Sequence, residues 1–207
     1  LVAGYQGRES VAQGEDFDPS HDNIDARTIT RQLDNGSTVV YLPKKTRGES
    51  VVASINLDFG NEADLFEQSV IGNMTVSMLD RGTQKYSREE LQAAFDELKA
   101  SVSVSGGSTG AGAGILTTKK NLAAVMELTE EIFKHPTFDS EELKVLKEEM
   151  IVGLEQEKQQ PTSRVFRELG NHLNPYSPGH PYYQISIDDE IAQIRSVTSK
   201  DLHAFHT

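Results

Sequence analysis

Three runs rich in apolar and β-branched residues lie between residues 28 and 59, and they are typical of β-strands. The runs 28–33 and 37–42 contain β-branched residues and flank Asp34-Asn35-Gly36, a sequence suited to a tight turn with positive φ angles. The third run, 50–59, has apolar residues at alternate positions. Three strands in succession predict an antiparallel sheet.

After Gly60 the spacing of apolar residues becomes helical. Val70, Met74 and Met78 recur at intervals of four residues, which predicts a helix. Ser87-Arg88-Glu89-Glu90 is a capping-box signature, and it predicts the start of a second helix.

Two more strands are expected at 100–105 and 111–118, joined by the glycine-rich segment Gly106–Gly110. Apolar periods then predict helices at 121–134, 139–159, 162–172 and 188–194, with another beginning after Thr198. Runs of strands followed by runs of helices are typical of an α+β fold, in which helices pack on one face of an antiparallel sheet.

Residues 1–26 have no hydrophobic period and are polar and acidic, so we interpret them as a linker or arm that follows a preceding domain. A single folded domain is expected at 27–207. The chain opens at Leu1 without a signal peptide and stops just after a helix start. We therefore expect a fragment of a longer polypeptide.

Composition narrows the classes of partner. The net charge is −12, from 20 Lys and Arg against 32 Asp and Glu, and such a field repels phosphate groups. We therefore expect neither nucleic acid nor an anionic membrane surface as a partner. The absence of cysteine excludes disulfides and thiolate chemistry. No apolar run approaches the ~18 residues of a membrane span.

The helix expected around Met74 carries the most informative pattern. In one class of zinc peptidases, His-x-x-Glu-His on a helix supplies two imidazole ligands and a general base. Asn73, Val76 and Ser77 stand at the corresponding positions here. None of them offers an imidazole or a carboxylate, so we predict that this helix neither binds Zn²⁺ nor activates water.

Several short strings occur in the order found in one peptidase family. They include Leu33-Asp34-Asn35-Gly36, Phe59-Gly60-Asn61-Glu62, Met78-Leu79-Asp80-Arg81-Gly82-Thr83, His135-Pro136-Thr137-Phe138, Asn174-Pro175-Tyr176 and His180-Pro181-Tyr182. With these strings the chain resembles the insulinase/pitrilysin-like (inverzincin) zinc metallopeptidases, among them mitochondrial processing peptidases and bacterial periplasmic zinc proteases. The resemblance covers residues 28–206 and implies the same α+β domain fold.

The resemblance also implies a further zinc ligand, from a Glu-x6-Glu pair on a later helix. Glu142 and Glu149 match this pair, with Glu149 at the ligand position. One carboxylate without two imidazoles does not make a hydrolytic zinc site, which takes three protein ligands. Two alternatives stay open. Glu149 belongs to a solvated, glutamate-rich helix face, or an unusual metal set of Glu149 with Asn73 supports an active hydrolase.

The glycine-rich segment has no phosphate-loop sequence, because it lacks Gly-Lys-Ser/Thr and joins two strands. Gly106, Gly107 and Ser108 are instead candidate contacts for an extended peptide that adds a strand to the sheet edge. The simpler interpretation is a hairpin of small residues that lets another backbone come close.

By resemblance, such peptidases contain a zinc-bearing half and a second half that closes a chamber around the substrate. We therefore predict a non-catalytic domain of a zinc metalloendopeptidase, inactive alone, which closes the chamber and helps bind peptide. Its expected partners are the catalytic half of the same polypeptide, which holds the zinc, and the peptide substrate; the expected compartment is the periplasm. The alternative is a structural scaffold domain of the same fold with no role in proteolysis.

Overall fold

The computed structural model describes residues 13–207, which belong to two compact units. One unit contains the described residues up to Val51 together with Thr118–Lys120, and the other contains Val52–Thr117 and Asn121–Thr207. Within residues 13–207, no helix is both long enough and apolar enough to cross a bilayer.

The first unit contains a short helix and a β-hairpin. Helix α1 (His21–Arg27) begins at Ser20, whose side chain accepts a hydrogen bond from a backbone N–H of the first turn. Strands β1 (Ile29–Gln32) and β2 (Thr38–Tyr41) pair antiparallel. Gly36 adopts a φ of 85° between them, as the Asn-Gly pair predicted.

The predicted hairpin is confirmed, but β1 and β2 form a two-stranded sheet of their own and do not extend the larger sheet. Of the arm expected at 1–26, the first twelve residues lie outside the described residues, and α1 begins within the remainder. The spacing of apolar residues did not predict α1, because none of the residues of this helix is buried. A short 3-10 helix, η1 (Arg47–Glu49), leads into the third strand.

The second unit is built on a three-stranded sheet in the order β3-β5-β4. Its strands are β3 (Ser50–Asp58), β4 (Ser101–Gly107) and β5 (Gly110–Thr118). β4 and β5 form an antiparallel hairpin in which Ser101 lies opposite Leu116. A Cβ atom at Gly110 would stand 2.8 Å from the carbonyl oxygen of Leu57 in β3. Glycine on β5 therefore allows the close approach of β3.

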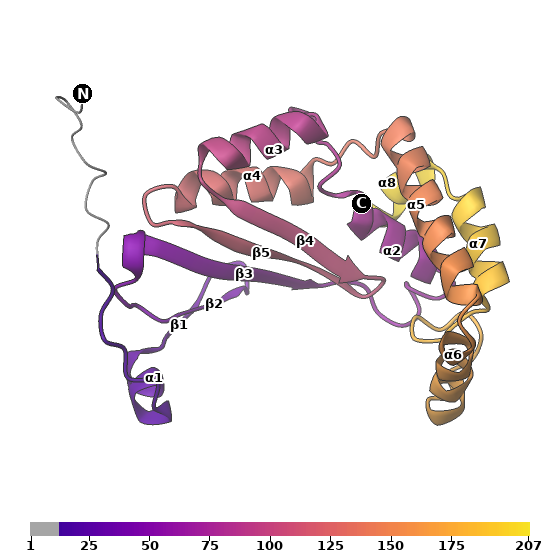
Figure 1. The fold of residues 1–207 in the computed structure, drawn as a ribbon, viewed down its shortest axis with the longest axis horizontal. Coiled ribbons are helices and arrows are strands. Elements are labelled where there is room, and N and C mark those ends of the chain that lie inside the picture. Colours follow the sequence, from indigo (N-terminus) through magenta and orange to yellow (C-terminus); the bar gives the residue numbers. More distant parts are fainter. Residues whose placement is uncertain (1–12) are drawn as a thin grey trace, which may run out of the picture. The chain divides into compact units, whose positions relative to one another are not determined.

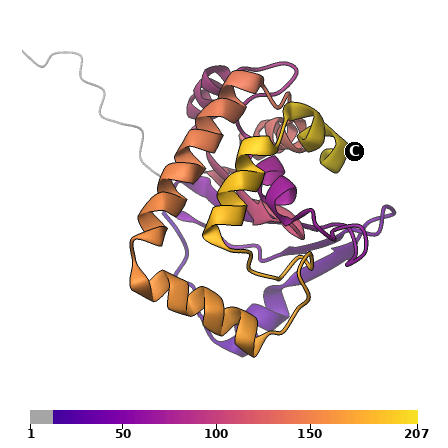
Figure 2. The ribbon, with the colours of Figure 1, turned by 90° about the vertical axis from the view of Figure 1, so that its right-hand side faces the viewer.

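The helices of the second unit are α2 (Ser69–Met78), α3 (Arg88–Glu97), α4 (Leu122–Lys134), α5 (Ser140–Lys158), α6 (Pro161–Leu173), α7 (Ile187–Ser196) and α8 (Ser199–His206). α3 and α4 lie over one face of the sheet (Figure 1). α5, α7 and α8 pack around α2 (Figure 2). This order of elements agrees with the order predicted from the apolar spacing, and the expected α+β fold is confirmed.

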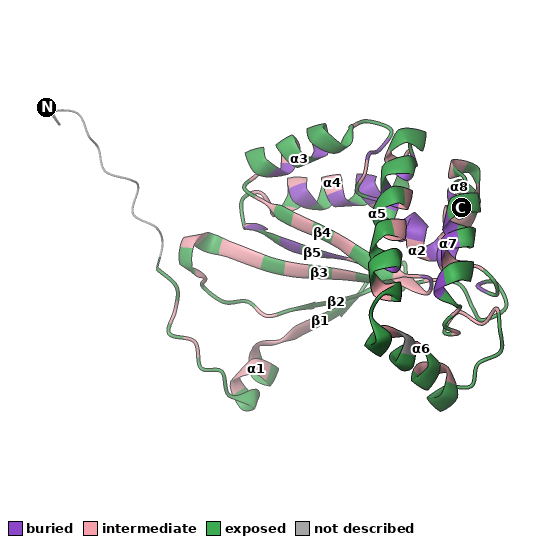
Figure 3. Cartoon of the chain, turned by 45° about the vertical axis from the view of Figure 1, so that its right-hand side comes forward, coloured by how far each residue is buried: buried purple, intermediate pink, exposed green. Residues whose placement is uncertain are grey.

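One hydrophobic core joins the sheet to α2, α3, α4, α5, α7 and α8, and α2 is its most buried helix (Figure 3). Met74 and Met78, spaced four residues apart, are 0% and 1% exposed. Ala111 and Ile115 of β5 are buried in the same core, as is Leu91 of α3. The apolar face of α2 therefore points into the core, and its other face is left to carry the polar positions of the candidate site.

Candidate functional site

We call Asn73, Val76 and Ser77 the degenerate positions, because they stand where the zinc-peptidase motif has His, Glu and His. All three lie on α2, but their surroundings differ. Val76 is buried, Asn73 is half-buried, and Ser77 is exposed. The hydroxyl of Ser77 donates a hydrogen bond to the backbone carbonyl of Asn73 at 2.9 Å. A serine that bonds to its own helix presents no nucleophile activated by a base, and Val76 has no group that could take up a proton.

Both carboxylates of the Glu-x6-Glu pair are on α5, and they meet arginines. Nη2 of Arg81 donates to Oε2 of Glu149 at 2.6 Å. Nη1 of the same guanidinium lies 3.7 Å from Oε2 of Glu142, and Arg88 donates to that oxygen at 3.3 Å. We call Arg81, Arg88, Glu142 and Glu149 the arginine clasp. Its two cations balance the two anions, since an arginine pairs well with carboxylates.

The local fold explains why Arg81 can reach α5. It follows Asn73 and Ser77 by eight and four residues, so it continues the same line of side chains just beyond the end of α2. Gly82, with a φ of 132°, then turns the chain away. From the sequence, Arg81 was named only as part of the string 78–83. The spacing from Asn73 and Ser77 was the signal that could have identified it.

Zinc does not fit this set of residues. Asn73, Val76 and Ser77 provide neither imidazole nor carboxylate, and Oε2 of Glu149 accepts a hydrogen bond from Arg81. Within residues 13–207, no three His, Asp or Glu side chains lie where they could share a metal ion. No step that needs a metal can therefore be derived from the residues of this site.

The other predicted set, Gly106, Gly107 and Ser108, packs against α2. Ser108 is buried, and a Cβ atom at Gly72 would stand 2.8 Å from its Cα atom. A Cβ atom at Gly107 would stand 3.2 Å from Oδ1 of Asn73. The fold thus brings the hairpin and the degenerate helix together. The backbone that approaches the small residues is that of α2 itself.

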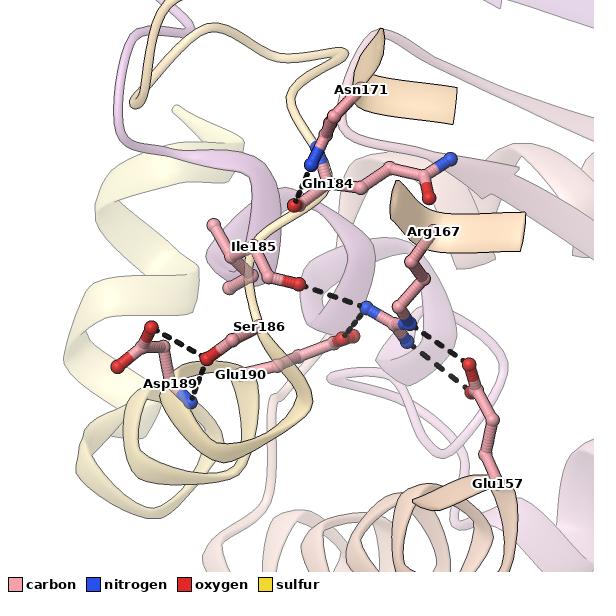
Figure 4. Close-up of polar contacts among 8 residues, drawn as sticks. All are labelled: Glu157, Arg167, Asn171, Gln184, Ile185, Ser186, Asp189 and Glu190. Carbon is pink, nitrogen blue, oxygen red and sulfur yellow. Dashed lines mark hydrogen bonds and ion pairs between the residues drawn. The ribbon is translucent and has the colours of Figure 1, made fainter. Parts of the chain in front are cut away.

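A groove of about 1390 Å³ opens beside Asn73, and sequence reasoning did not find it. Its walls come from α2, α6, α7 and the segment 178–186; we call it the α2–α7 groove. Arg167 of α6 stands in its lining, between Glu157 and Glu190 (Figure 4). Hydrogen bonds from Arg167 hold the pKa of Glu157 below its usual value, and those to Glu157 raise the pKa of Arg167. The cluster of aromatic residues in the loop 174–183 was the signal in the sequence that could have indicated this groove.

Neither the models of protein families nor the curated proteins give a significant match to this sequence, but solved structures do. A peptidase M16 inactive domain from Pseudomonas fluorescens matches with a TM-score of 0.71 and 22% identity, over 86% of this chain and 42% of that one. The periplasmic protease PqqL from Escherichia coli matches with a TM-score of 0.66 and 14% identity, over 95% and 20%. A mutant of the ferredoxin protease FusC, in complex with Arabidopsis ferredoxin, matches with a TM-score of 0.61 and 18% identity, over 95% and 21%.

The chain therefore has the fold of M16 peptidase domains, and the fold that the family resemblance implied is confirmed. It spans less than half the length of each of these structures. The first half of PqqL also matches, with a TM-score of 0.64, alongside the inactive domain. Because proteases and an inactive domain share the fold, the fold does not decide activity. Whether a domain with this fold is active depends on the side chains at its site.

Proposed function

We propose that this chain is a catalytically inert domain of a zinc metalloendopeptidase, in which residues 27–207 form the domain and 1–26 an arm before it. The observation that carries the proposal is the arginine clasp. The carboxylates that match the family's ligand pair are bound by Arg81 and Arg88, and α2 supplies no imidazole to complete a metal site.

The proposed role is to close the chamber and help bind the peptide that the zinc-bearing half of the same polypeptide hydrolyses. Two features support it. The chain spans only a fraction of the length of the proteases with this fold, so further domains accompany the fold there. In addition, β4 is an edge strand of its sheet, and an extended peptide can add to such an edge.

PqqL is described as a periplasmic protease, and the structure of FusC contains a ferredoxin. By analogy, we place the parent of this chain in the periplasm, with a peptide or protein substrate and zinc in its other half. The chemistry in that half is attack on a peptide carbonyl by metal-activated water. No residue of this chain takes part in that step.

The test compares the purified chain with its full-length parent on one quenched-fluorescence peptide, with and without a chelator. The proposal predicts that the parent cleaves the peptide until the chelator is added, and that the chain binds the peptide without cleaving it. Zinc-dependent cleavage by the chain alone would contradict the proposal. A parent that neither binds nor cleaves peptides would favour the structural scaffold.

A further inference from the structure

The segment 178–186, which lines the α2–α7 groove, contains turns at 178–182 and is held in place by hydrogen bonds to its neighbours. The segment 178–186 is tied to the chain just before α2 by the hydrogen bond from the backbone N–H of Glu67 to the carbonyl of Gly179, at 2.7 Å. It is tied to α6 by a reciprocal pair, in which the amide of Asn171 bonds both the carbonyl and the N–H of Gln184, at 2.8 and 3.0 Å (Figure 4). A groove that is already formed costs a ligand little ordering entropy.

The charge of the groove is negative among the described residues that line it. Four carboxylate side chains face one guanidinium there; they are Glu67, Glu157, Asp189 and Glu190, against Arg167. Arg167 is already occupied, because it makes two hydrogen bonds to Glu157 and one to Glu190. Glu67 makes no side-chain hydrogen bond or ion pair with the residues that the structure describes. An incoming cation therefore meets unbalanced negative charge.

Two exposed aromatic side chains also line the groove. Phe166 of α6 is 68% exposed and Tyr182 of the segment 178–186 is 59% exposed. The Tyr182 ring is braced, since its centroid lies 5.6 Å from that of Tyr176 and 5.4 Å from that of His180. An exposed but braced aromatic ring is a favourable anchor for an apolar or cationic side chain.

We infer that the α2–α7 groove binds an extended peptide segment in which an aromatic or aliphatic side chain stands next to a lysine or arginine. The apolar side chain packs on Phe166 and Tyr182, and the cation lies near Glu67. The inference rests on the proposed role in peptide binding and names the class of peptide. It places the contact beside Asn73, so the peptide passes the degenerate face of α2.

The probe is a fluorescein-labelled decapeptide with two Phe-Lys pairs separated by Gly-Ser, compared with the same peptide carrying Glu in place of Lys. Fluorescence anisotropy with the chain is expected to show about tenfold tighter binding of the lysine peptide, weakening as salt is added. Glu67→Gln should weaken the lysine peptide about threefold. Tyr182→Ala should weaken both peptides about fivefold or more.

Glu155→Gln is the matched control, because Glu155 is exposed on α5 and does not line the groove. It removes the same charge as Glu67→Gln and should leave both affinities unchanged. Circular dichroism and the thermal midpoint of each variant separate lost binding from lost folding. All of the substituted side chains are exposed, so folding should be retained.

Equal affinity for the lysine and glutamate peptides would overturn the inference while leaving the proposed function in place. So would binding that Glu67→Gln and Tyr182→Ala do not change, because the peptide would then lie elsewhere. Failure of the chain and of its parent to bind any peptide would remove the proposed function as well. In the parent, a photo-crosslink from the peptide to the segment 178–186 is expected; its absence while peptide is bound would contradict the inference.

Discussion

At the scale of single residues, Arg81 separates this chain from a zinc site. Its side chain is 11% exposed, and its guanidinium reaches both Glu142 and Glu149, so a cation of the chain itself stands among the carboxylates. The absence of an imidazole at Asn73 and Ser77 and the pairing of the two carboxylates with arginines act in the same direction. Each of them alone would weaken a metal site, and together they leave no ligand set.

The first prediction concerns the arginine clasp. Arg81→Gln should lower the free energy of unfolding by about 1–2 kcal/mol, because it removes a charged hydrogen bond from Glu149 and the neighbouring charge from Glu142. Arg88→Gln is the control, since Arg88 is 47% exposed, and it should cost under about 1 kcal/mol. Urea denaturation measures both. Equal, negligible effects would show that the clasp does not stabilise the fold.

A pair of glycines provides the second prediction. A Cβ atom at Gly106 would lie 2.3 Å from the carbonyl oxygen of Gly110, so Gly106→Ala should destabilise the chain by about 1–3 kcal/mol. Gly153 lies within α5 with no atom within 4 Å of such a Cβ, so Gly153→Ala should stabilise by up to about 1 kcal/mol. Thermal unfolding of the two variants should shift in opposite directions; a shift of both in the same direction would contradict the geometry.

At the scale of elements, α5 connects most of the site. It carries the clasp residues Glu142 and Glu149, and near its end Glu157, which bonds Arg167 of α6. Its start is set by Asp139, whose side chain accepts hydrogen bonds from two N–H groups of the first turn. The clasp and the groove are thus joined by one helix, and the end of α5 is held to α6 by charge.

That contact predicts a dependence on pH. Arg167 lowers the pKa of Glu157 in the folded state, so the pair contributes its full stability above the pKa of a free glutamate, about 4.3. The contribution is lost as the pH falls through the depressed folded-state pKa. Glu157→Gln should therefore destabilise the chain at pH 7, and the difference from the wild type should shrink towards pH 3.

Denaturant midpoints of the wild type and Glu157→Gln at several pH values measure this difference directly. Glu155→Gln, at an exposed position on the same helix, should show little difference from the wild type at any of them. A Glu157→Gln effect that stays constant from pH 7 to pH 3 would show that the ion pair does not hold α6.

Local signals explain which elements could be predicted from the sequence. The capping box at Ser87 and Glu90 marks the start of α3, and Thr198 with Asp201 marks that of α8. Both signals depend only on residues three apart. α1 was not predicted, because an exposed helix of 7 residues has no apolar face to reveal it.

The candidate site was predicted only in part, for a related physical reason. Asn73, Val76 and Ser77 could be placed on one helix from their spacing alone. The partner of Glu149 could not, since Arg81 lies 68 residues away in sequence and meets it only after α2 and α5 have packed. The groove likewise joins α2 with segments more than 80 residues further along the chain.

At the scale of the whole molecule, the chain has the fold of M16 peptidase domains, and Asn73, Val76 and Ser77 of α2 supply neither imidazole nor carboxylate. Structures with this fold include proteases and an inactive domain, so activity depends on a few side chains placed on a shared scaffold. In this chain those positions hold an arginine clasp and a hairpin packed on α2. The proposed functions therefore use surfaces: the edge of the sheet and the α2–α7 groove.

The most direct test of this account is the zinc content of the purified chain after exposure to equimolar zinc and gel filtration, measured by mass spectrometry of the metal. The account predicts far less than one zinc per chain, with no change on Glu149→Gln. If the chain binds one zinc and Glu149→Gln abolishes this binding, the account is contradicted, because Glu149 would then bind the metal in place of Arg81.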